Sequence, residues 1–376
     1  MDAVGEWGGL RLDDAKPISE LRNGYTYFRD GDTVVAKVTP CFENGKGALA
    51  VGLVGGIAFG TTELQVLRPG ARLDSRFLFY LTLSHAFRAT GASEMYGAGG
   101  QKRVPEWFCR DFMAPVPPLS TQRLLAAFLD RKTAAIDQLI QKKERLIELL
   151  QEKRQALIDR LLEPDHGPFV KLGHFADLLP GYAFPSDGFN HDGGVRLLRG
   201  VNVSTGTLRW GESVYWPTNH VAALSRFRLR AGDVVLGMDR PRVSSGIRAA
   251  VVTESDCPGL LLQRVARLRA RTGLAQEYIL LLVSSPKFHA YFEPIMTGVS
   301  VPHISPDQIL GFRFRLPRIG AQQQACESFR TETLKTEKLQ SQLETHVALL
   351  GEYRQALISA AVTGHIGVSF GEPFRG

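Results

Sequence analysis

Two ten-residue segments of this chain are nearly identical and lie 200 positions apart. Residues 149–158 read Leu-Leu-Gln-Glu-Lys-Arg-Gln-Ala-Leu-Ile, and residues 349–358 match them at eight of the ten positions. The match extends upstream, where Gly31-Asp32 corresponds to Gly232-Asp233 at an offset of 201. Because matched residues keep their order, the pattern indicates a tandem duplication. It predicts two equivalent units related by a pseudo-two-fold axis.

Each repeat is predicted to begin with a mixed α/β globule. A Gly-Asp turn leads into a short run of β-branched residues, which is typical of a strand that follows a tight turn. An apolar helix is expected after the strands, at residues 77–87 in the first copy and 278–288 in the second. The expected strands lie at residues 34–35 and 63–67 in the first copy and at 234–235 and 264–268 in the second.

A long helix is expected to close each repeat. In the first copy, no Gly or Pro interrupts the chain from near Gln122 to near Leu162, and forty-odd residues rising ~1.5 Å each give about 60 Å. Apolar residues recur at steps of four and three, which is typical of a coiled-coil seam. Because neither helix can bury such a stripe alone, we expect the two helices to pair antiparallel. The residues assigned to this seam are Leu139, Leu146, Leu150, Leu157, Leu339, Leu343, Leu350 and Leu357.

The predicted fold class is therefore α+β, with two tandem globules, two long helices and an antiparallel coiled coil. The first globule has no counterpart of residues 170–203, so we expect it to be N-terminally short. The predicted domains are residues 1–118 (first globule), 119–163 (first helix), 164–318 (second globule) and 319–376 (second helix and tail).

Composition restricts the location of the protein and its binding partners. Hydrophobic residues make up 44% of the chain and charged residues 22%, which is ordinary for a globular protein. No apolar run approaches the ~20 residues of a membrane span, and four scattered cysteines fit a reducing compartment. We therefore expect a cytoplasmic protein with no membrane partner. The net charge of +7 is compatible with nucleic-acid binding.

The common catalytic motifs are absent from the sequence. Residues 44–47 lack the spacing of a phosphate-binding loop, and the histidines and cysteines are dispersed. Pro117-Pro118 lacks the flanking residues with which an amino-methyltransferase holds its target base. We therefore expect no catalytic residue, no metal site and no cofactor on this chain.

Arginine residues are concentrated in the second globule. Residues 226–271 contain ten arginines and four acidic residues, and guanidinium groups suit phosphate oxygens and guanine edges. Two pairs of loops occupy equivalent positions in the copies, 39–46 with 240–248 and 99–103 with 300–303. Each pair differs in sequence, as expected if the globules read different half-sites. The candidate DNA-binding residues are Lys37, Asn44, Lys46, Gln101, Lys102, Arg103, Arg240, Arg242, Ser244, Arg248 and His303.

The segments at 112–119, 128–130, 152–158 and 354–364 resemble the specificity subunits of Type I restriction–modification systems. This resemblance covers nearly the whole chain. It implies a non-catalytic DNA-binding subunit with two target-recognition domains, each reading half of a bipartite double-stranded site. The helices would be a spacer and a docking surface for two methyltransferase subunits, which restriction subunits join. Adenine methylation and ATP-driven cleavage, with S-adenosylmethionine, ATP and Mg²⁺, would belong to those partners.

Two other classes of function stay open at the level of sequence. A stand-alone DNA methyltransferase or nuclease would need a methyl-donor or metal site on this chain. A coiled-coil scaffold without DNA readout would keep its function if Arg240, Arg242 and Arg248 were replaced.

Overall fold

The computed structural model describes residues 1–366 except 14, 22–23, 99, 164–166, 219–220 and 299–300. Gly99, Pro164 and Ser300, which belong to predicted loops and a predicted boundary, lie outside the described residues. The chain divides into two compact units, the first formed by residues 1–144 and 343–376 and the second by residues 145–342. Each long helix therefore contributes to both units. The four predicted domain ranges follow a different division and stay a prediction.

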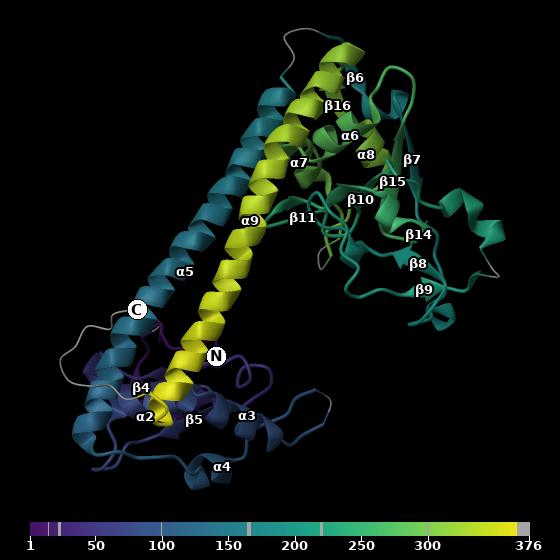
Figure 1. The fold of residues 1–376 in the computed structure, drawn as a ribbon. Coiled ribbons are helices and arrows are strands. Elements are labelled where there is room, and N and C mark those ends of the chain that lie inside the picture. The colour runs from purple at the N-terminus through teal and green to yellow at the C-terminus, as the bar shows by residue number, and fades with distance from the viewer. Residues whose placement is uncertain are drawn as a thin grey trace. The chain divides into compact units, whose positions relative to one another are not determined.

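The two long helices are confirmed, as α5 (Leu119–Leu161) and α9 (Ile319–Val362) (Figure 1). In the first unit, Asp137 of α5 forms an ion pair with Arg354 of α9. Further along α5, the Lys143 amine lies 3.3 Å from His346 Nδ1. Residue numbers rise along one helix as they fall along the other, so these segments run antiparallel.

The two helices also pair in the second unit. There the later part of α5 packs against the earlier part of α9, the reverse of the arrangement in the first unit. Lys153 of α5 lies 4.0 Å from Glu332 of α9, and the Arg154 guanidinium lies 5.6 Å from the Phe329 ring centroid. Arg154 and Arg354 are equivalent in the repeat. The Arg354 guanidinium likewise stacks on an aromatic ring, 5.1 Å from the centroid of Trp7 in the first unit.

The buried seam of the helices differs in register from the predicted stripe. Leu157, Leu343 and Leu357 are buried, and Leu150 and Leu350 are half-buried. Leu139, Leu146 and Leu339 are instead 40–43% exposed, which corrects their assignment to the seam. The physical reason is that polar side chains occupy several seam positions, so leucine spacing alone selects the wrong face. The seam of the first copy runs through Leu129, Thr133, Ile136, Ile140, Lys143, Ile147, Leu150, Arg154 and Leu157.

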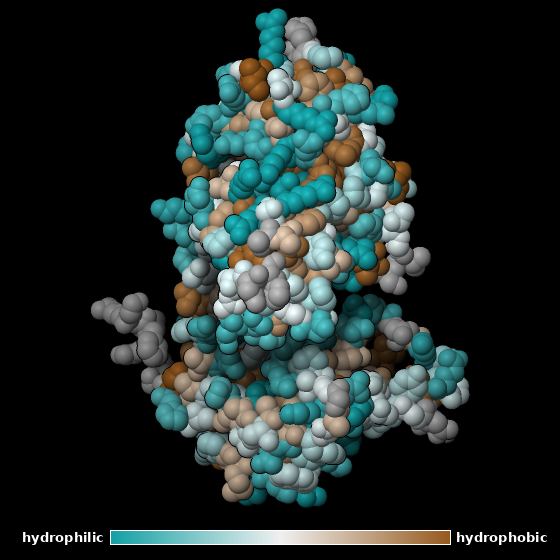
Figure 2. Space-filling model, turned by 90° about the vertical axis from the view of Figure 1, so that its right-hand side faces the viewer, coloured by the Kyte–Doolittle hydropathy of each residue, from teal (hydrophilic) through white to brown (hydrophobic). Residues whose placement is uncertain are grey.

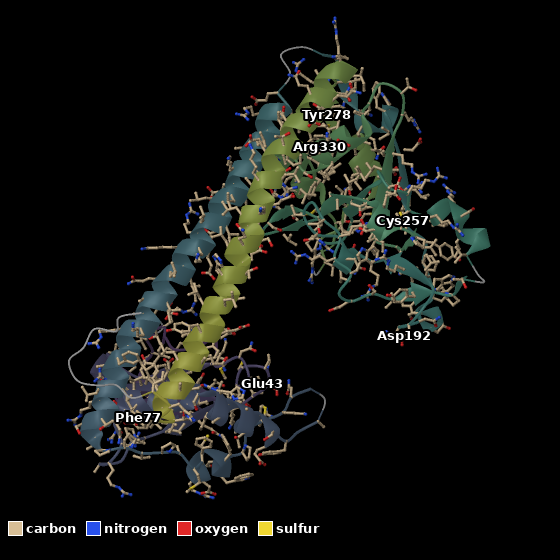
Figure 3. The ribbon with its side chains drawn as sticks, in the orientation of Figure 1. Glu43, Phe77, Asp192, Cys257, Tyr278 and Arg330 are labelled. Atoms are coloured by element: carbon tan, nitrogen blue, oxygen red, sulfur yellow. The ribbon has the colours of Figure 1, made fainter. Side chains whose placement is uncertain are left out.

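The globule of the first unit is built on a short antiparallel sheet of strand order β3-β2-β5. Val34 of the central strand pairs with Ala48 on one side and Val66 on the other. Helix α2 packs against this sheet and contributes Phe77, which is fully buried (Figure 3). The elements are α1 (Ile18–Leu21), β1 (Thr26–Arg29), β2 (Thr33–Ala36), β3 (Gly47–Leu49), β4 (Ile57–Gly60), β5 (Leu64–Leu67), α2 (Ser75–Leu83), α3 (His85–Ser93) and α4 (Glu106–Asp111).

The globule of the second unit repeats this arrangement and adds strands to it. Its central sheet has the order β13-β10-β15-β7, in which β10 and β15 are the equivalents of β2 and β5. Tyr278 of α6 takes the buried place of Phe77 (Figure 3). The elements are β6 (Phe169–Lys171), β7 (Ala176–Pro180), β8 (Val195–Leu198), β9 (Tyr215–Trp216), β10 (Val234–Gly237), β11 (Arg242–Val243), β12 (Gly246–Ile247), β13 (Ala249–Val251), β14 (Gly259–Leu261), β15 (Val265–Ala270), α6 (Gln276–Val283), α7 (Pro286–Phe292), α8 (Pro306–Gly311) and β16 (Arg313–Arg315).

The single apolar helix predicted in each globule is in fact two helices. In the first unit, α2 ends before Ser84, whose side chain accepts a hydrogen bond from the Phe87 N–H and begins α3. In the second unit, Ser285 accepts from the Phe288 N–H in the same way, and Pro286 follows it. A serine cap offers the backbone a partner outside the helix, and this interrupts an apolar run that would otherwise read as continuous.

A buried aspartate anchors the turn before the central strand in each globule. Asp32 accepts the backbone N–H of Arg29 and two hydrogen bonds from Arg68, at 2.8 and 2.7 Å. Asp233 accepts equivalent bonds from the Arg230 N–H and from Arg269. Bidentate arginine–carboxylate pairs hold both groups in a defined geometry, so they position the strand and the loop that follows it.

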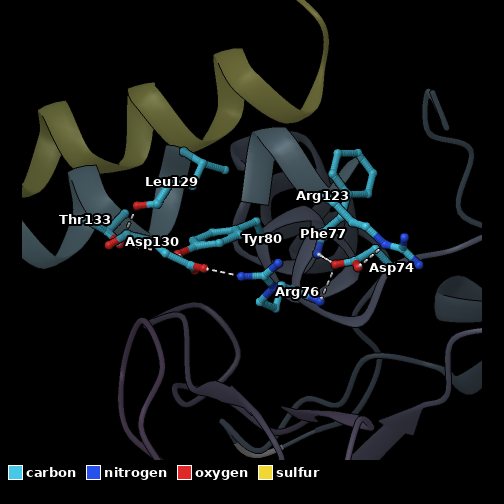
Figure 4. A network of polar contacts seen from close by, with 8 residues as sticks. All are labelled: Asp74, Arg76, Phe77, Tyr80, Arg123, Leu129, Asp130 and Thr133. Carbon is cyan, nitrogen blue, oxygen red and sulfur yellow. Dashed lines mark hydrogen bonds and ion pairs between the residues drawn. The ribbon is translucent and has the colours of Figure 1, made fainter. Parts of the chain in front are cut away.

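In the first unit, a polar network joins α2 to α5 (Figure 4). Asp74 accepts from the Arg76 and Phe77 N–H groups and so caps α2. Arg76 in turn donates to Asp130 of α5 at 2.9 Å, and the Tyr80 hydroxyl donates to the same carboxylate at 2.7 Å. The start of α2 is thereby tied to one face of the long helix.

A buried glutamine near the start of each long helix fixes that helix to its globule. The Gln322 side chain accepts from the Ala275 N–H at 2.7 Å and donates to the carbonyls of Gly273 and Pro317. Gln122 makes the equivalent three bonds in the first unit, with the backbone of Asp74, Arg72 and Pro117. Both side chains are fully buried.

We expect Gln322→Ala to lower the free energy of unfolding by about 2–4 kcal/mol, because three backbone groups would lose their partner. Gln323→Ala is the matched control, since Gln323 is the exposed neighbour on the same helix. Urea unfolding of both variants measures the difference. Equal stabilities would contradict the assigned role.

Acid should weaken the Asp32 anchor. The hydrogen bond from Arg68 holds the pKa of this carboxyl below its ordinary value of 3.8. A carboxyl with a lowered folded-state pKa stabilises the fold above its unfolded pKa, and this contribution is lost as the pH falls through the folded pKa. We expect Asp32→Asn to cost about 2 kcal/mol at pH 7 and progressively less below about pH 4. Urea unfolding across this range would contradict the role if the difference stayed constant.

Candidate nucleic-acid interface

In each unit, the two loops expected to read DNA are hydrogen-bonded to each other. In the first unit, the Thr39 N–H donates to the Lys102 carbonyl at 3.0 Å, and Val38 pairs with Arg103. In the second unit, the Arg240 N–H donates to the Pro302 carbonyl at 2.7 Å. The tertiary structure thus joins loops that are about 60 residues apart in sequence into one composite surface in each globule.

The side chains that fasten this junction differ between the units. In the first unit, Arg103 donates two hydrogen bonds of 2.9 Å to Glu63, and these bonds lower the pKa of the Glu63 carboxyl. In the second unit, His303 replaces the arginine and its Nδ1 lies 2.6 Å from Asp239. The shared scaffold therefore carries different charges in the two copies.

Six of the predicted DNA-binding side chains are exposed, and five are half-buried. Asn44 is exposed and donates a hydrogen bond of 3.3 Å to Glu6. Arg240 has a positive φ of 43°, a backbone conformation that few non-glycine residues adopt. The exposed residues are Asn44, Gln101, Lys102, Arg240, Arg242 and Ser244. The half-buried residues are Lys37, Lys46, Arg103, Arg248 and His303.

Arg248 is held inside the second globule by backbone carbonyl groups. Its guanidinium donates to the Val203 carbonyl and to the Asp239 carbonyl, both at 3.0 Å. Burial lowers the pKa of this guanidinium. These contacts give Arg248 a structural role in holding the loop; its predicted contact with DNA stays a prediction.

The arginine loop of the second unit folds as a short hairpin, β11–β12, beside helix α5. Arg242 and Ser244 line a cleft of about 490 Å³ together with Glu148 and Glu152 of α5. His289 of α7 borders the same cleft, and burial, followed by the nearby charge of Arg242, lowers the pKa of its imidazole. The hairpin thus has one side against the helix, and Arg242 itself stays exposed.

Several arginines of the basic cluster pair with other groups of the same globule. Arg269 bonds Asp233, Arg271 bonds Asp177, and Arg267 donates to the carbonyls of Arg226 and Arg228. Arg226, Arg228 and Arg230 have exposed side chains. On the face drawn in Figure 2, hydrophilic side chains predominate and hydrophobic ones are scattered among them.

An aromatic residue, Tyr96, also lies at the composite surface, although it was not among the predicted DNA-binding residues. Tyr96 is 64% exposed, and its backbone pairs with that of Arg103. An exposed aromatic ring that precedes Gln101 and Lys102 in the chain can stack on a base or pack on a sugar. The signal in the sequence was an aromatic residue directly before a Gly-rich basic loop.

Within the described residues, no group of three or more His, Cys, Asp or Glu side chains is arranged to hold a metal ion. None of the helices described there is long and apolar enough to cross a membrane.

Comparison with known proteins finds relatives of this chain among curated sequences and solved structures. No protein-family model matches the chain. The Type I restriction enzyme EcoAI specificity subunit of Escherichia coli is 28% identical over 390 residues, which cover 79% of this chain and 66% of that protein. The MjaVIII specificity subunit of Methanocaldococcus jannaschii is 24% identical over 290 residues, which cover 72% of this chain and 66% of that protein.

A solved structure has the same fold. A chain from a study of complex assembly and conformational transition in a type I R-M system aligns with a TM-score of 0.66 at 19% identity, over 95% of this chain and 86% of that chain. The curated homologues of this protein are thus specificity subunits of Type I restriction enzymes. The chain spans about two thirds (66%) of the length of these two relatives.

Replacing Arg240 and Arg248 with Ala should affect the stability of the fold to different extents. We expect Arg248→Ala to lower the free energy of unfolding by about 1–3 kcal/mol, because two partly buried carbonyl groups lose a charged donor. Arg240→Ala should change it by less than about 0.5 kcal/mol, since its side chain is exposed. Chemical denaturation compares the two variants directly. A larger loss for Arg240→Ala would reverse the roles proposed for them.

Proposed function

We propose that this protein is the DNA-recognition subunit of a Type I restriction–modification complex. In this proposal each globule reads one half of a bipartite double-stranded site through its composite loop surface. The curated homologues support the proposal, because they are specificity subunits.

One structural observation carries the proposal. In both units an equivalent scaffold presents two adjoining loops, and the loops differ in sequence and charge although their anchors match. The Asp32–Arg68 and Asp233–Arg269 pairs belong to the constant part, and Arg103 and His303 belong to the variable part. A protein that reads two different half-sites needs this combination.

The remaining parts of the proposal concern partners and cofactors. We assign two methyltransferase subunits and the restriction subunits to the surface of the long helices. Adenine methylation and ATP-dependent cleavage, with S-adenosylmethionine, ATP and Mg²⁺, are assigned to those subunits. Under this assignment the chain is non-catalytic and works in the cytoplasm.

A stand-alone methyltransferase or nuclease is the weaker alternative, since it would require a site built from this chain alone. A scaffold without DNA readout is also weaker, because it gives no reason for two exposed loops to be held together in each globule.

Co-expression with a Type I methyltransferase subunit tests the proposal. Sequencing of methylated adenines in the host DNA should show one bipartite motif. Methylation at scattered positions, or none, would refute the proposal, and turnover by the isolated chain would favour the enzyme alternative.

Replacing Arg240 and Arg242 with Ala should then weaken methylation at one half-site. Each arginine that reads a base contributes about 1–3 kcal/mol of discrimination, so a loss of about tenfold or more is expected. Arg313→Ala is the matched control, because Arg313 is exposed on β16 of the same unit. Equal effects of all three substitutions would argue against base reading by the hairpin.

A further inference from the structure

In the first unit, a side chain of the recognition loop is part of the hydrophobic core. Phe42, from the loop at 39–46, is 1% exposed and lies against Phe87 of α3, with the ring centroids 6.0 Å apart. In the second unit, the equivalent ring of Phe288 packs on Phe292 of the same helix, α7, at 5.1 Å. Phe292 is fully buried. The two units therefore cover the same core ring from different elements, a loop in one and a helix in the other.

A glycine in α3 makes room for the loop side chain. Gly91 is the equivalent of Phe292, at the same offset of 201 that relates the serine caps of α3 and α7. A Cβ on Gly91 would collide with the Phe42 ring. The loop at 240–248 of the second unit contains no aromatic residue. Each copy thus supplies one aromatic ring at this place, from the loop or from the helix and not from both.

A buried arginine of α3 also holds Phe42. The Arg88 guanidinium donates to the Phe42 carbonyl at 2.9 Å and lies 4.8 Å from the centroid of the Phe42 ring. Arg88 is 5% exposed, and burial lowers the pKa of its guanidinium to about 10. Among the described residues, its Nε and Nη2 have no hydrogen-bond partner. A buried guanidinium with two unsatisfied nitrogens lowers stability, so the contribution of Arg88 lies in the placing of Phe42.

The inward position of Phe42 determines which loop residues face outward. The N–H groups of residues 44–46 donate to the carbonyls of residues 40–42 at 2.9–3.0 Å, which closes the loop as a compact turn. Glu43 and Asn44 follow Phe42 directly and are exposed (Figure 3). One anchored ring and its carbonyl thereby fix the position of the polar residues beside it.

We propose that Phe42 and Arg88 are positioning residues for the reading of the first half-site. They hold the loop in one conformation before DNA binds, so that Asn44 and Lys46 meet the DNA without the cost of ordering a flexible segment. The second unit presents a hairpin without this anchor, so the effect is confined to one half-site. This inference rests on the proposed function for its DNA part, whereas the order of the loop is a property of the chain alone.

Moving the ring from the loop to the helix tests the proposal. Phe42→Val combined with Gly91→Phe gives the first unit the pattern of the second and keeps the core filled. In amide hydrogen exchange on the full-length protein, we expect the amides of residues 44–46 to exchange at least about tenfold faster than in the wild type. The amides of β2 should keep their protection. Unchanged exchange of the loop amides in the folded double variant would overturn the proposal.

Phe108→Leu is the matched control for this exchange of rings. Phe108 belongs to the same core cluster but lies on α4, outside the loop. The substitution should lower the midpoint of urea unfolding and leave the amides of residues 44–46 protected. An increase in their exchange as large as that of the double variant would assign Phe42 to general core packing and overturn the proposal.

Arg88→Met separates the order of the loop from the stability of the fold. Methionine retains an apolar stem but cannot donate to the Phe42 carbonyl. We expect faster exchange of the loop amides together with a urea midpoint equal to or above that of the wild type, because an unsatisfied buried charge is removed. Arg88→Lys retains a donor and should restore part of the protection. A lower midpoint with unchanged loop exchange would show an ordinary packing role and contradict the proposal.

Methylation by the complex with the methyltransferase subunit measures the effect on reading. With the Phe42→Val and Gly91→Phe variant, methylated sites that carry a changed base in one half and an intact other half should become about tenfold or more abundant. Equal relaxation of both halves, or an unchanged motif, would overturn the proposal. A wild-type complex that methylates no bipartite motif would instead refute the proposed function, and protected loop amides in the wild-type chain would distinguish that failure from this one.

Discussion

The fold depends on long helices that cannot bury their own seams. The first part of α5 and the last part of α9 belong to one compact unit, and their other parts belong to the second. Each globule is therefore completed by a helix segment from the opposite copy. The Asp137–Arg354 ion pair and the packing of Arg154 on Phe329 hold these exchanged segments. Removing either helix would expose apolar surface in both units.

This exchange separates the constant parts of the protein from its variable parts. The buried glutamines and the aspartate–arginine anchors recur in both copies, and they place two loops side by side in each globule. The loop residues themselves are free to differ, because their backbone pairing makes little use of side chains. A duplicated scaffold can thus present two loop surfaces that differ in sequence.

Features that repeat along the chain were predicted correctly, whereas features in which local chemistry interrupts a pattern were not. Both long helices and the strands at 34–35 and 234–235 were predicted correctly. The seam register was wrong at Leu139, because Thr133 and Arg154 fill seam positions that a count of leucines passes over. The apolar helices were predicted as continuous, although Ser84 and Ser285 cap a second helix within each run.

The sequence by itself determined the duplication, the helical connectors and the position of the loops that differ between copies, since these follow from spacing and residue type. Tertiary structure decided which loops meet and which arginines are available. Arg248 and Arg269 read as exposed basic residues in the sequence, yet both are held by groups distant along the chain. A guanidinium binds any suitable oxygen within reach, and only the folded backbone determines which oxygen that is.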